Sequence, residues 1–293
     1  MKNNILKYFI LIFSVLVIFI VYLSTVGVET DKFNDQIKKR ISLINKKIDI
    51  DLKKIKLILD PFKLKIYAKT VGTTVYFSKR PLALENIKIH VSLSSLIKNK
   101  ISSSNIEVTT KSILLNDLIK FIQSTNNKPE LFTLEKIVKK GHVIIDLSLN
   151  IDEKGKIKND YEIVGLIKDA SINFLNKANF KNINFNFSFQ KDNYLFNEIN
   201  FKLEKVNFTS KKLNVKKKKN SFLIDAIVEN NKSSLNSNIL KLLNLSLENI
   251  IIDEAKFKTN NKFSLEIDEK FKVKNIILSS DINITKLNIK IKI

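Results

Sequence analysis

Apolar side chains occupy every second position in two runs near the middle of the chain. Between residues 181 and 210, polar residues separate this set: Ile183, Phe185, Phe187, Phe189, Ile199, Phe201 and Leu203. A two-residue period puts alternate side chains on opposite faces of a strand, so the stretch predicts strands with one apolar face. A second set of the same kind consists of Ile145, Leu147 and Leu149. We expect both sets to line one apolar surface.

The same alternation recurs along most of the chain and predicts a mainly β fold. Further runs lie at residues 48–52, 64–68, 87–93, 143–151, 161–167, 222–228, 250–257, 263–267 and 282–293. Short polar segments such as DEKGK (152–156) and KKKKN (216–220) separate several of these runs and indicate hairpin turns. Successive strands joined by such turns are typical of an antiparallel sheet.

Three segments repeat their apolar residues at three- and four-residue intervals, which predicts helices. They lie at residues 33–48, 114–122 and 235–243. The first carries lysines and an arginine opposite its isoleucines. Such a helix either rests on a membrane surface, where basic residues meet lipid phosphates, or caps one end of the sheet. Both interpretations stay open at this point.

Residues 8–28 carry no charge and consist mostly of Ile, Leu, Val and Phe. About 20 such residues in a helix cross the hydrocarbon core of a bilayer, so the segment predicts a transmembrane helix. Lys2 and Lys7 precede it, while Glu29 and Asp31 follow it, which places the N-terminus in the cytoplasm and the rest outside. A cleaved signal peptide is the alternative. We favour an anchor, because the apolar part of a signal peptide runs for only ~7 to 15 residues.

These elements divide the chain into three predicted segments. Residues 1–32 form the anchor. Residues 33–125 contain a helix, a first set of strands and a short helix. The polar stretch 124–129 predicts a linker, and residues 126–293 form an extended antiparallel region.

The net charge of +22 changes this picture little. Most lysines stand singly on the polar phase of a predicted strand, as Lys63, Lys65, Lys88 and Lys290 do. Dispersed charge of this kind does not form the basic patch that nucleic acid requires, so no nucleic-acid partner is predicted. The chain has only five Gly and three Pro, which argues against folds that depend on Gly-rich phosphate-binding loops. It has no Cys, and therefore no disulfide and no thiolate metal site.

The chain offers little for catalysis. Its two histidines, His90 and His142, have no Ser or Cys partner at a spacing that makes a nucleophile, and both are expected on solvated strand positions. Carboxylates occur in pairs beside lysines, as in Asp49 with Asp51, which indicates solvated surface. We therefore predict no enzyme activity, no metal site and no cofactor.

Something must cover the apolar face of so many strands. The predicted helices are too few and too short. A second sheet could pack on the face as in a β-sandwich. An outer-membrane barrel would use lipid, but it needs aromatic girdles and the chain has no Trp. The last possibility is a curled sheet whose covering is a ligand with long hydrocarbon chains.

A family resemblance favours the last possibility. Three passages carry it: STVGVETDKFNDQIKKRISLINKKIDIDLKKIKLILD (24–60), LENIKIHVSLSSLIKNKISSSNIEV (84–108) and DEKGKIKNDYEIVGLIKDASI (152–172). Together with the N-terminal apolar segment, they resemble the AsmA-like superfamily of Gram-negative envelopes. Its plan is an inner-membrane helix, a short helix, a strand pair that ends in a phrase similar to HVSLSSLIKNK (90–100), and long antiparallel β-structure. The bridging members of the family are usually much longer than 293 residues.

The resemblance implies an elongated, curled antiparallel sheet with an apolar groove, anchored in the inner membrane with most of the chain in the periplasm. Its expected partners are phospholipid acyl chains and other envelope proteins that extend the groove. The expected function is phospholipid binding or transfer in outer-membrane maintenance. The alternative function is a tethered assembly factor for outer-membrane proteins, which would act through exposed strand edges.

Overall fold

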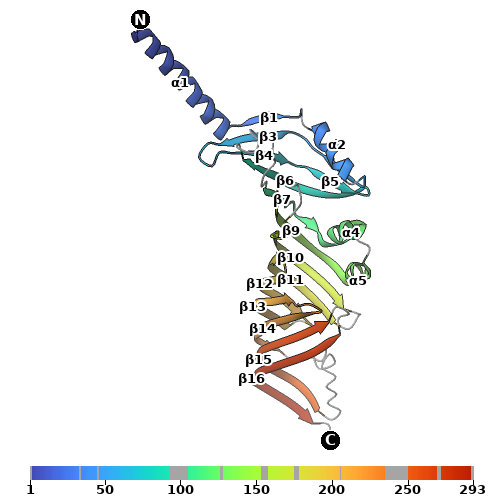
Figure 1. The fold of residues 1–293 in the computed structure, drawn as a ribbon. Helices are drawn as coiled ribbons and strands as arrows, with labels where there is room; N and C mark the ends of the chain where they lie inside the picture. The colour runs from blue at the N-terminus through green and yellow to red at the C-terminus, as the bar shows by residue number, and fades with distance from the viewer. Residues whose placement is uncertain are drawn as a thin grey trace. The chain divides into compact units, whose positions relative to one another are not determined.

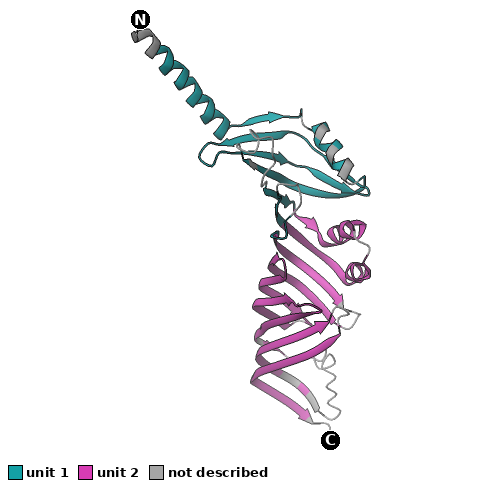
Figure 2. Ribbon diagram, in the orientation of Figure 1, with its two compact units in different colours: residues 1–111, 146–161 teal, residues 112–145, 162–293 magenta. Residues whose placement is uncertain are grey.

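The computed structural model describes residues 2–32, 34–44, 46–92, 105–125, 128–152, 158–174, 178–204, 206–234, 250–268 and 272–291. Within them the protein is mainly β, with one apolar N-terminal helix and a long antiparallel sheet (Figure 1). The predicted fold class is confirmed at that level. The chain forms two compact units, residues 1–111 with 146–161 and residues 112–145 with 162–293 (Figure 2).

The first unit begins with the apolar helix α1 and continues as a small sheet. Its elements are α1 (Lys2–Thr25), β1 (Val28–Thr30), α2 (Asn34–Ile44), β2 (Ile48–Asp51), β3 (Ile55–Asp60), β4 (Lys65–Val71), β5 (Thr74–Phe77), β6 (Arg80–Ser92) and β7 (Asn105–Thr110). Strands pair antiparallel in the order β1-β3-β4-β6-β7, and β5 pairs with both β2 and β6. The buried side chains of this unit include Ile50, Leu52, Ile55 and Leu84.

The helix predicted at residues 33–48 is confirmed as α2, but it is shorter. Ile48 begins strand β2 and pairs with Phe77, because Ile48 and Ile50 alternate with Asp in a strand pattern. The side chain of Asn34 donates hydrogen bonds to the carbonyl oxygens of Leu52 and Lys53, which fixes the start of α2 to the sheet. α2 therefore packs on the unit, with Lys38 and Lys39 exposed.

The second unit is a meander of long strands with two helices at its start. Its elements are β8 (Ile113–Leu114), α4 (Leu115–Thr125), α5 (Pro129–Ile137), β10 (Glu162–Phe174), β11 (Ala178–Gln190), β12 (Asn193–Leu203), β13 (Val206–Lys217), β14 (Ser221–Ser234), β15 (Ile250–Asp268) and β16 (Val273–Ile291). The first residues of β9 (Val138–Asn150) also belong to it. β9 neighbours β10 in the sheet, and each strand from β10 onward pairs antiparallel with the next.

The two helices of this unit differ in how well the sequence predicts them. The helix predicted at residues 114–122 is confirmed as α4. α5 was not predicted, because residues 124–129 suggested only a linker. Pro129 instead opens α5, a position where its missing N–H costs no hydrogen bond. Gln123 of α4 donates hydrogen bonds to the Leu131 carbonyl and the Glu135 carboxylate of α5.

Several predicted features lie outside the described residues. They are the helix at 235–243, most of the turn at 152–156 and most of the HVSLSSLIKNK phrase. The turn at residues 216–220 is confirmed, since β13 ends at Lys217 and β14 begins at Ser221. The runs predicted at 250–257 and 263–267 are one continuous strand, β15.

One-residue register shifts recur in the strand pairs β10–β11, β11–β12, β13–β14 and β14–β15. At Asp169, Asn182 and Glu198 the backbone has positive φ angles of 51°, 50° and 54°. These are β-bulges, in which an extra residue on one strand faces the gap between two partners. The bulges explain why the apolar phase moves by one position, from Phe196 to Ile199 for example. Both halves of each strand thereby keep their apolar side chains on one face.

Candidate functional site

The second unit has one face formed mostly by apolar side chains. Directly opposed residues of antiparallel strands share a face, so the register defines its members. They include Ile163, Gly165, Ile167, Phe180, Ile183, Phe185, Phe187, Phe189, Tyr194, Phe196, Phe201, Leu203, Val206, Phe208, Leu213, Val215, Ile224, Ala226, Phe263, Leu265, Ile276 and Leu278. We call this surface the apolar face.

The seven residues predicted on β11 and β12 lie together on the apolar face. Phe180, opposite Leu203, and Phe208, opposite Phe201, extend the set to neighbouring positions. Ring contacts join its aromatic residues into two clusters, one on each side of the bulges. The Phe187 and Phe189 centroids are 4.9 Å apart, and those of Phe201 and Phe208 are 5.4 Å apart.

The second predicted set is divided between the two units. Ile145 is half-buried and belongs to the second unit. Leu147 and Leu149 belong to the first unit, where they lie opposite Val108 and Ile106 of β7. The structure therefore brings Leu147 and Leu149 into an apolar surface with β7, within the first unit.

Burial varies along the apolar face. Ile183 and Phe187 are 9% and 7% exposed, whereas the other five predicted residues on β11 and β12 are half-buried. Exposure increases on β16, where Leu278 and Ile282 are each 64% exposed. Among the described residues, the apolar face is therefore only partly covered by protein.

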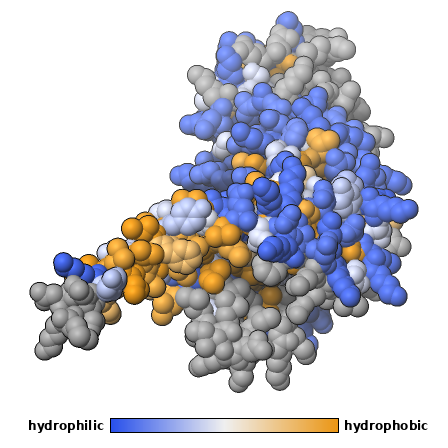
Figure 3. All heavy atoms as spheres, turned by 90° about the horizontal axis from the view of Figure 1, so that it is seen from above, coloured by the Kyte–Doolittle hydropathy of each residue, from blue (hydrophilic) through white to orange (hydrophobic). Residues whose placement is uncertain are grey.

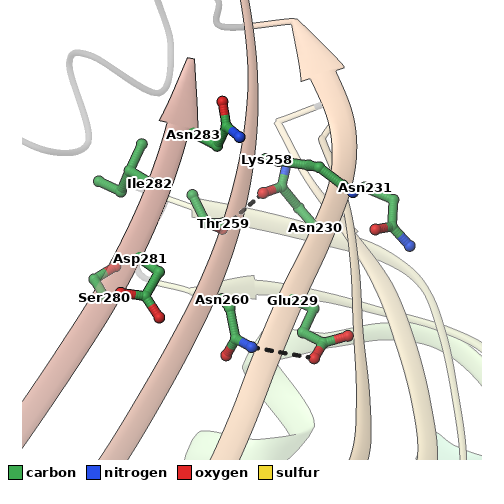
Figure 4. Close-up of a pocket in the computed structure, with 10 residues that line it drawn as sticks. All are labelled: Glu229, Asn230, Asn231, Lys258, Thr259, Asn260, Ser280, Asp281, Ile282 and Asn283. Atoms are coloured by element: carbon green, nitrogen blue, oxygen red, sulfur yellow. Dashed lines mark hydrogen bonds between the residues drawn. The ribbon is translucent and has the colours of Figure 1, made fainter. Parts of the chain in front are cut away.

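A row of polar side chains crosses the apolar face on β14, β15 and β16. The row consists of Asn230, Thr259, Asn261 and Ser280, and we call it the polar belt. Figure 4 shows Asn230, Thr259 and Ser280 of this row. The Thr259 hydroxyl donates to Asn230 Oδ1 at 2.6 Å, and the Asn261 side chain donates to Thr259 Oγ1 at 2.9 Å. Ser280 Oγ donates to Asn261 Oδ1. Asn230 is only 1% exposed, so the belt is built into the sheet.

The polar belt was not predicted from the sequence. Its signal is a polar residue at a position where the two-residue period calls for an apolar one, as in Phe257-x-Thr259-x-Asn261-x-Phe263. An open hollow of about 510 Å³ lies at these strands, lined by Glu229, Asn230, Thr259, Asp281 and their neighbours. On its wall, Asn260 donates a hydrogen bond to Glu229 (Figure 4).

The opposite face of the same strands carries mostly polar side chains. Asn184 donates to Asn200 Oδ1 at 3.0 Å, and Asn186 donates to Glu198 at 2.9 Å, so amide side chains join β11 to β12 beside the bulges. In the view of Figure 3, apolar residues gather along α1, while hydrophilic residues cover most of the other visible described surface.

Titratable groups with shifted pKa values lie outside the apolar face. The pKa of Glu266 is lowered, first by the hydrogen bond that Ser221 Oγ donates at 2.7 Å and then by Lys218 and Lys274. His90 was expected to be solvated, but it lies half-buried against the ring of Tyr67 and 3.2 Å from Glu107. Within the described residues, no group of three His, Asp or Glu side chains is placed to hold a metal ion.

Comparison with known proteins adds no relative. No protein-family model, no curated protein and no solved structure matches this chain. A functional assignment therefore rests on the residues described above.

Proposed function

We propose that the protein is a single-pass membrane-anchored lipid-binding protein, in which the apolar face takes up the acyl chains of phospholipids. The main support is the partly open apolar face, which extends from β10 to β16. Contiguous apolar surface that is open to water on a folded protein marks a binding site for an apolar partner. A hydrocarbon chain fits such a site, because it offers no polar group that needs a hydrogen bond.

The energy of such binding comes from apolar area removed from water. Burial contributes about 25 cal/mol per Å², or about 0.8 kcal/mol for each methylene group. This contribution has no direction, so a chain can move along the apolar face without breaking specific bonds. The mechanism is binding, shielding and release, and no covalent bond is made or broken.

We further propose that the sheet of the second unit curls into a groove. β-Bulges bend a strand and increase its twist, and they recur in neighbouring strands from β10 to β14. A curved sheet would contact an acyl chain from more than one side. It would therefore bury more of the chain than a flat sheet.

The proposed membrane and compartment are supported by α1 and by the family resemblance. Residues Lys7–Thr25 form a helix long and apolar enough to cross a bilayer, and none of that stretch is buried against the protein. A membrane anchor and a signal sequence share this character. With α1 as an anchor in the inner membrane, the resemblance to the AsmA-like superfamily supports a periplasmic protein that contributes to phospholipid movement, with other envelope proteins extending the groove.

Site-specific photocrosslinking tests the proposal. Phe201 and Lys202 are adjacent in β12 but lie on opposite faces, opposite Phe208 and Asn207. A photoreactive amino acid at Phe201 of the full chain, expressed in a Gram-negative host, should yield phospholipid adducts, and one at Lys202 should not. Equal labelling at the two positions, or none at Phe201, would contradict lipid binding by the apolar face.

The alternative is a tethered assembly factor. β16 supports it, because within the described residues it pairs only with β15, and an open edge can accept a strand from another protein. Protein adducts along β16, together with no lipid adduct at Phe201, would favour this alternative.

A further inference from the structure

The turn between β3 and β4 carries an unusually exposed apolar tip. Residues 60–65 read DPFKLK. Phe62 is 97% exposed, the largest exposure of any large hydrophobic residue described, and Leu64 is 63% exposed. Lys63 and Lys65 beside them are exposed as well. We call residues 60–65 the hairpin tip.

The strand register puts the hairpin tip beside the end of α1. Val28 of β1 pairs with Leu57 of β3, and the two strands run in opposite directions. The last residues of β3 therefore run back past Gly27 toward α1, and α1 contacts β3. In Figure 1 the loop between β3 and β4 lies near the foot of α1.

The junction between α1 and the sheet is short and tightly packed. Only Val26 and Gly27 separate the helix from β1, and both donate backbone hydrogen bonds to the Tyr22 carbonyl. Gly27 has a φ of 72°, and a β-carbon there would lie 2.5 Å from the Leu57 carbonyl oxygen. Glycine is the residue that accepts both constraints. The end of α1 and the hairpin tip are thus held close together.

The conformation of the tip is fixed by Asp60. Its Oδ1 atom accepts hydrogen bonds from the backbone N–H groups of Phe62 and Lys63, and its Oδ2 atom accepts one from the Tyr67 hydroxyl at 2.8 Å. The Lys63 N–H and then the Tyr67 hydroxyl hold the pKa of Asp60 below its usual value. The turn therefore has its conformation before any partner binds, with the Phe62 side chain exposed to solvent.

We propose that the hairpin tip is a second membrane contact. Phe62 and Leu64 enter the boundary between headgroups and acyl chains of the bilayer that α1 crosses, and Lys63 and Lys65 lie against lipid phosphates. Aromatic and aliphatic side chains flanked by lysines are suited to this boundary. Tyr22, in the last turn of α1, has the amphipathic ring typical of headgroup depth.

This contact rests on the proposed anchoring by α1, but it is separate from the lipid-carrying role, because it uses the first unit and not the apolar face of the second. A single helix can tilt in the bilayer and carry the attached unit with it. A second contact beside the helix limits that tilt. The first unit therefore keeps a defined tilt relative to the bilayer surface.

The absence of Trp from the chain provides a direct test. Phe62→Trp gives the full-length protein one indole, which can be measured in nanodiscs that contain lipids brominated on the acyl chain. We expect blue-shifted emission and strong quenching by bromine close to the headgroup. Emission typical of an indole in water, without quenching, would overturn the proposal.

Tyr76→Trp in β5 is the matched control. Tyr76 pairs with Pro81 of β6, and Lys65 pairs with Ser92, so Tyr76 lies eleven positions along β6 from the tip. At about 3.3 Å per residue this distance is roughly 36 Å. Its emission should not respond to brominated lipid. Equal quenching of both variants would show a general association of the first unit with lipid, and would contradict a contact made by the tip.

Substitution of Lys63 and Lys65 gives a second test. Both side chains are exposed, so the fold should tolerate the change. In the Phe62→Trp background, Lys63→Glu with Lys65→Glu should reduce quenching several-fold in nanodiscs with anionic lipid. The loss should be smaller with zwitterionic lipid at the same salt concentration. Unchanged quenching in both lipids would exclude a role for the two lysines.

Discussion

The ring of Phe187 in β11 lies over the backbone of Gly165 in β10. The two residues are direct cross-strand partners. A β-carbon on Gly165 would lie 2.4 Å from Phe187 Cζ and 2.5 Å from the Ile144 carbonyl oxygen. Phe187 is buried on a partly open face because the missing side chain of Gly165 leaves room for its ring.

Gly165→Ala is expected to destabilise the second unit by about 1–3 kcal/mol, because the new methyl group overlaps the Phe187 ring and the backbone of β9. The urea midpoint of unfolding measures this loss. Phe187→Leu frees part of the space, so the double variant should lose less than the sum of the single variants. Strictly additive losses would show that the ring does not limit the space at Gly165.

Asn230→Ala is expected to cost about 1–3 kcal/mol, because it leaves the Thr259 hydroxyl without its buried acceptor. Thermal unfolding of the full chain measures the change. Asn231→Ala, at the next, exposed position of β14, is the control and should change stability little. A similar loss of stability in both variants would mean that the buried polar belt contributes no more to stability than an exposed asparagine does.

Acid is expected to weaken the fold partly through Glu266. Its folded pKa lies below the ordinary value of 4.5, so the unfolded chain binds the proton more readily. The group therefore stabilises the fold above pH 4.5, and this contribution is lost as the pH falls toward the folded pKa. Ser221→Ala removes the main cause of the lowered pKa. It should reduce the difference in unfolding midpoint between neutral and acidic solution, while the exposed Ser279→Ala should leave that difference unchanged.

Leu278→Asp is expected to reduce lipid binding several-fold, because it puts a carboxylate on the apolar face at an exposed site that the fold tolerates. The measurement is the yield of lipid adducts from a photoreactive group at Phe201. Ser279→Asp adds the same charge on the opposite face, opposite Lys262. Equal yields from the two variants would count against the apolar face as the lipid path.

The strands and the apolar side of β11 and β12 could be predicted because a two-residue period is a local property. The face on which Phe185 and Phe187 lie could be predicted without reference to the rest of the chain. The start of β12 was harder. Tyr194 and Phe196 are on the other phase from Ile199, so the predicted apolar set contains neither of them. The bulge at Glu198 instead carries the strand through the phase change.

Other features depend on contacts that the local pattern does not contain. The polar belt requires Asn230, Thr259 and Ser280 from three strands to meet, and only the register brings them together. α5 begins at Pro129, and the same proline equally suits a linker or the first turn of a helix. The division of Leu147 and Leu149 from the β11 set depends on which strands pair with β9.

The bulges of β10 to β14 make strand length, more than side-chain identity, the sensitive quantity in this protein. Removal of Asn182 would shift the phase of β11 by one residue. Every side chain on one side of the deletion would then turn to the wrong face. Exchange of one apolar residue for another leaves that order intact. Related sequences should therefore vary among Phe, Ile and Leu at most of these positions, with Phe187 held by its contact with Gly165. They should gain or lose residues at the bulges only in compensating pairs.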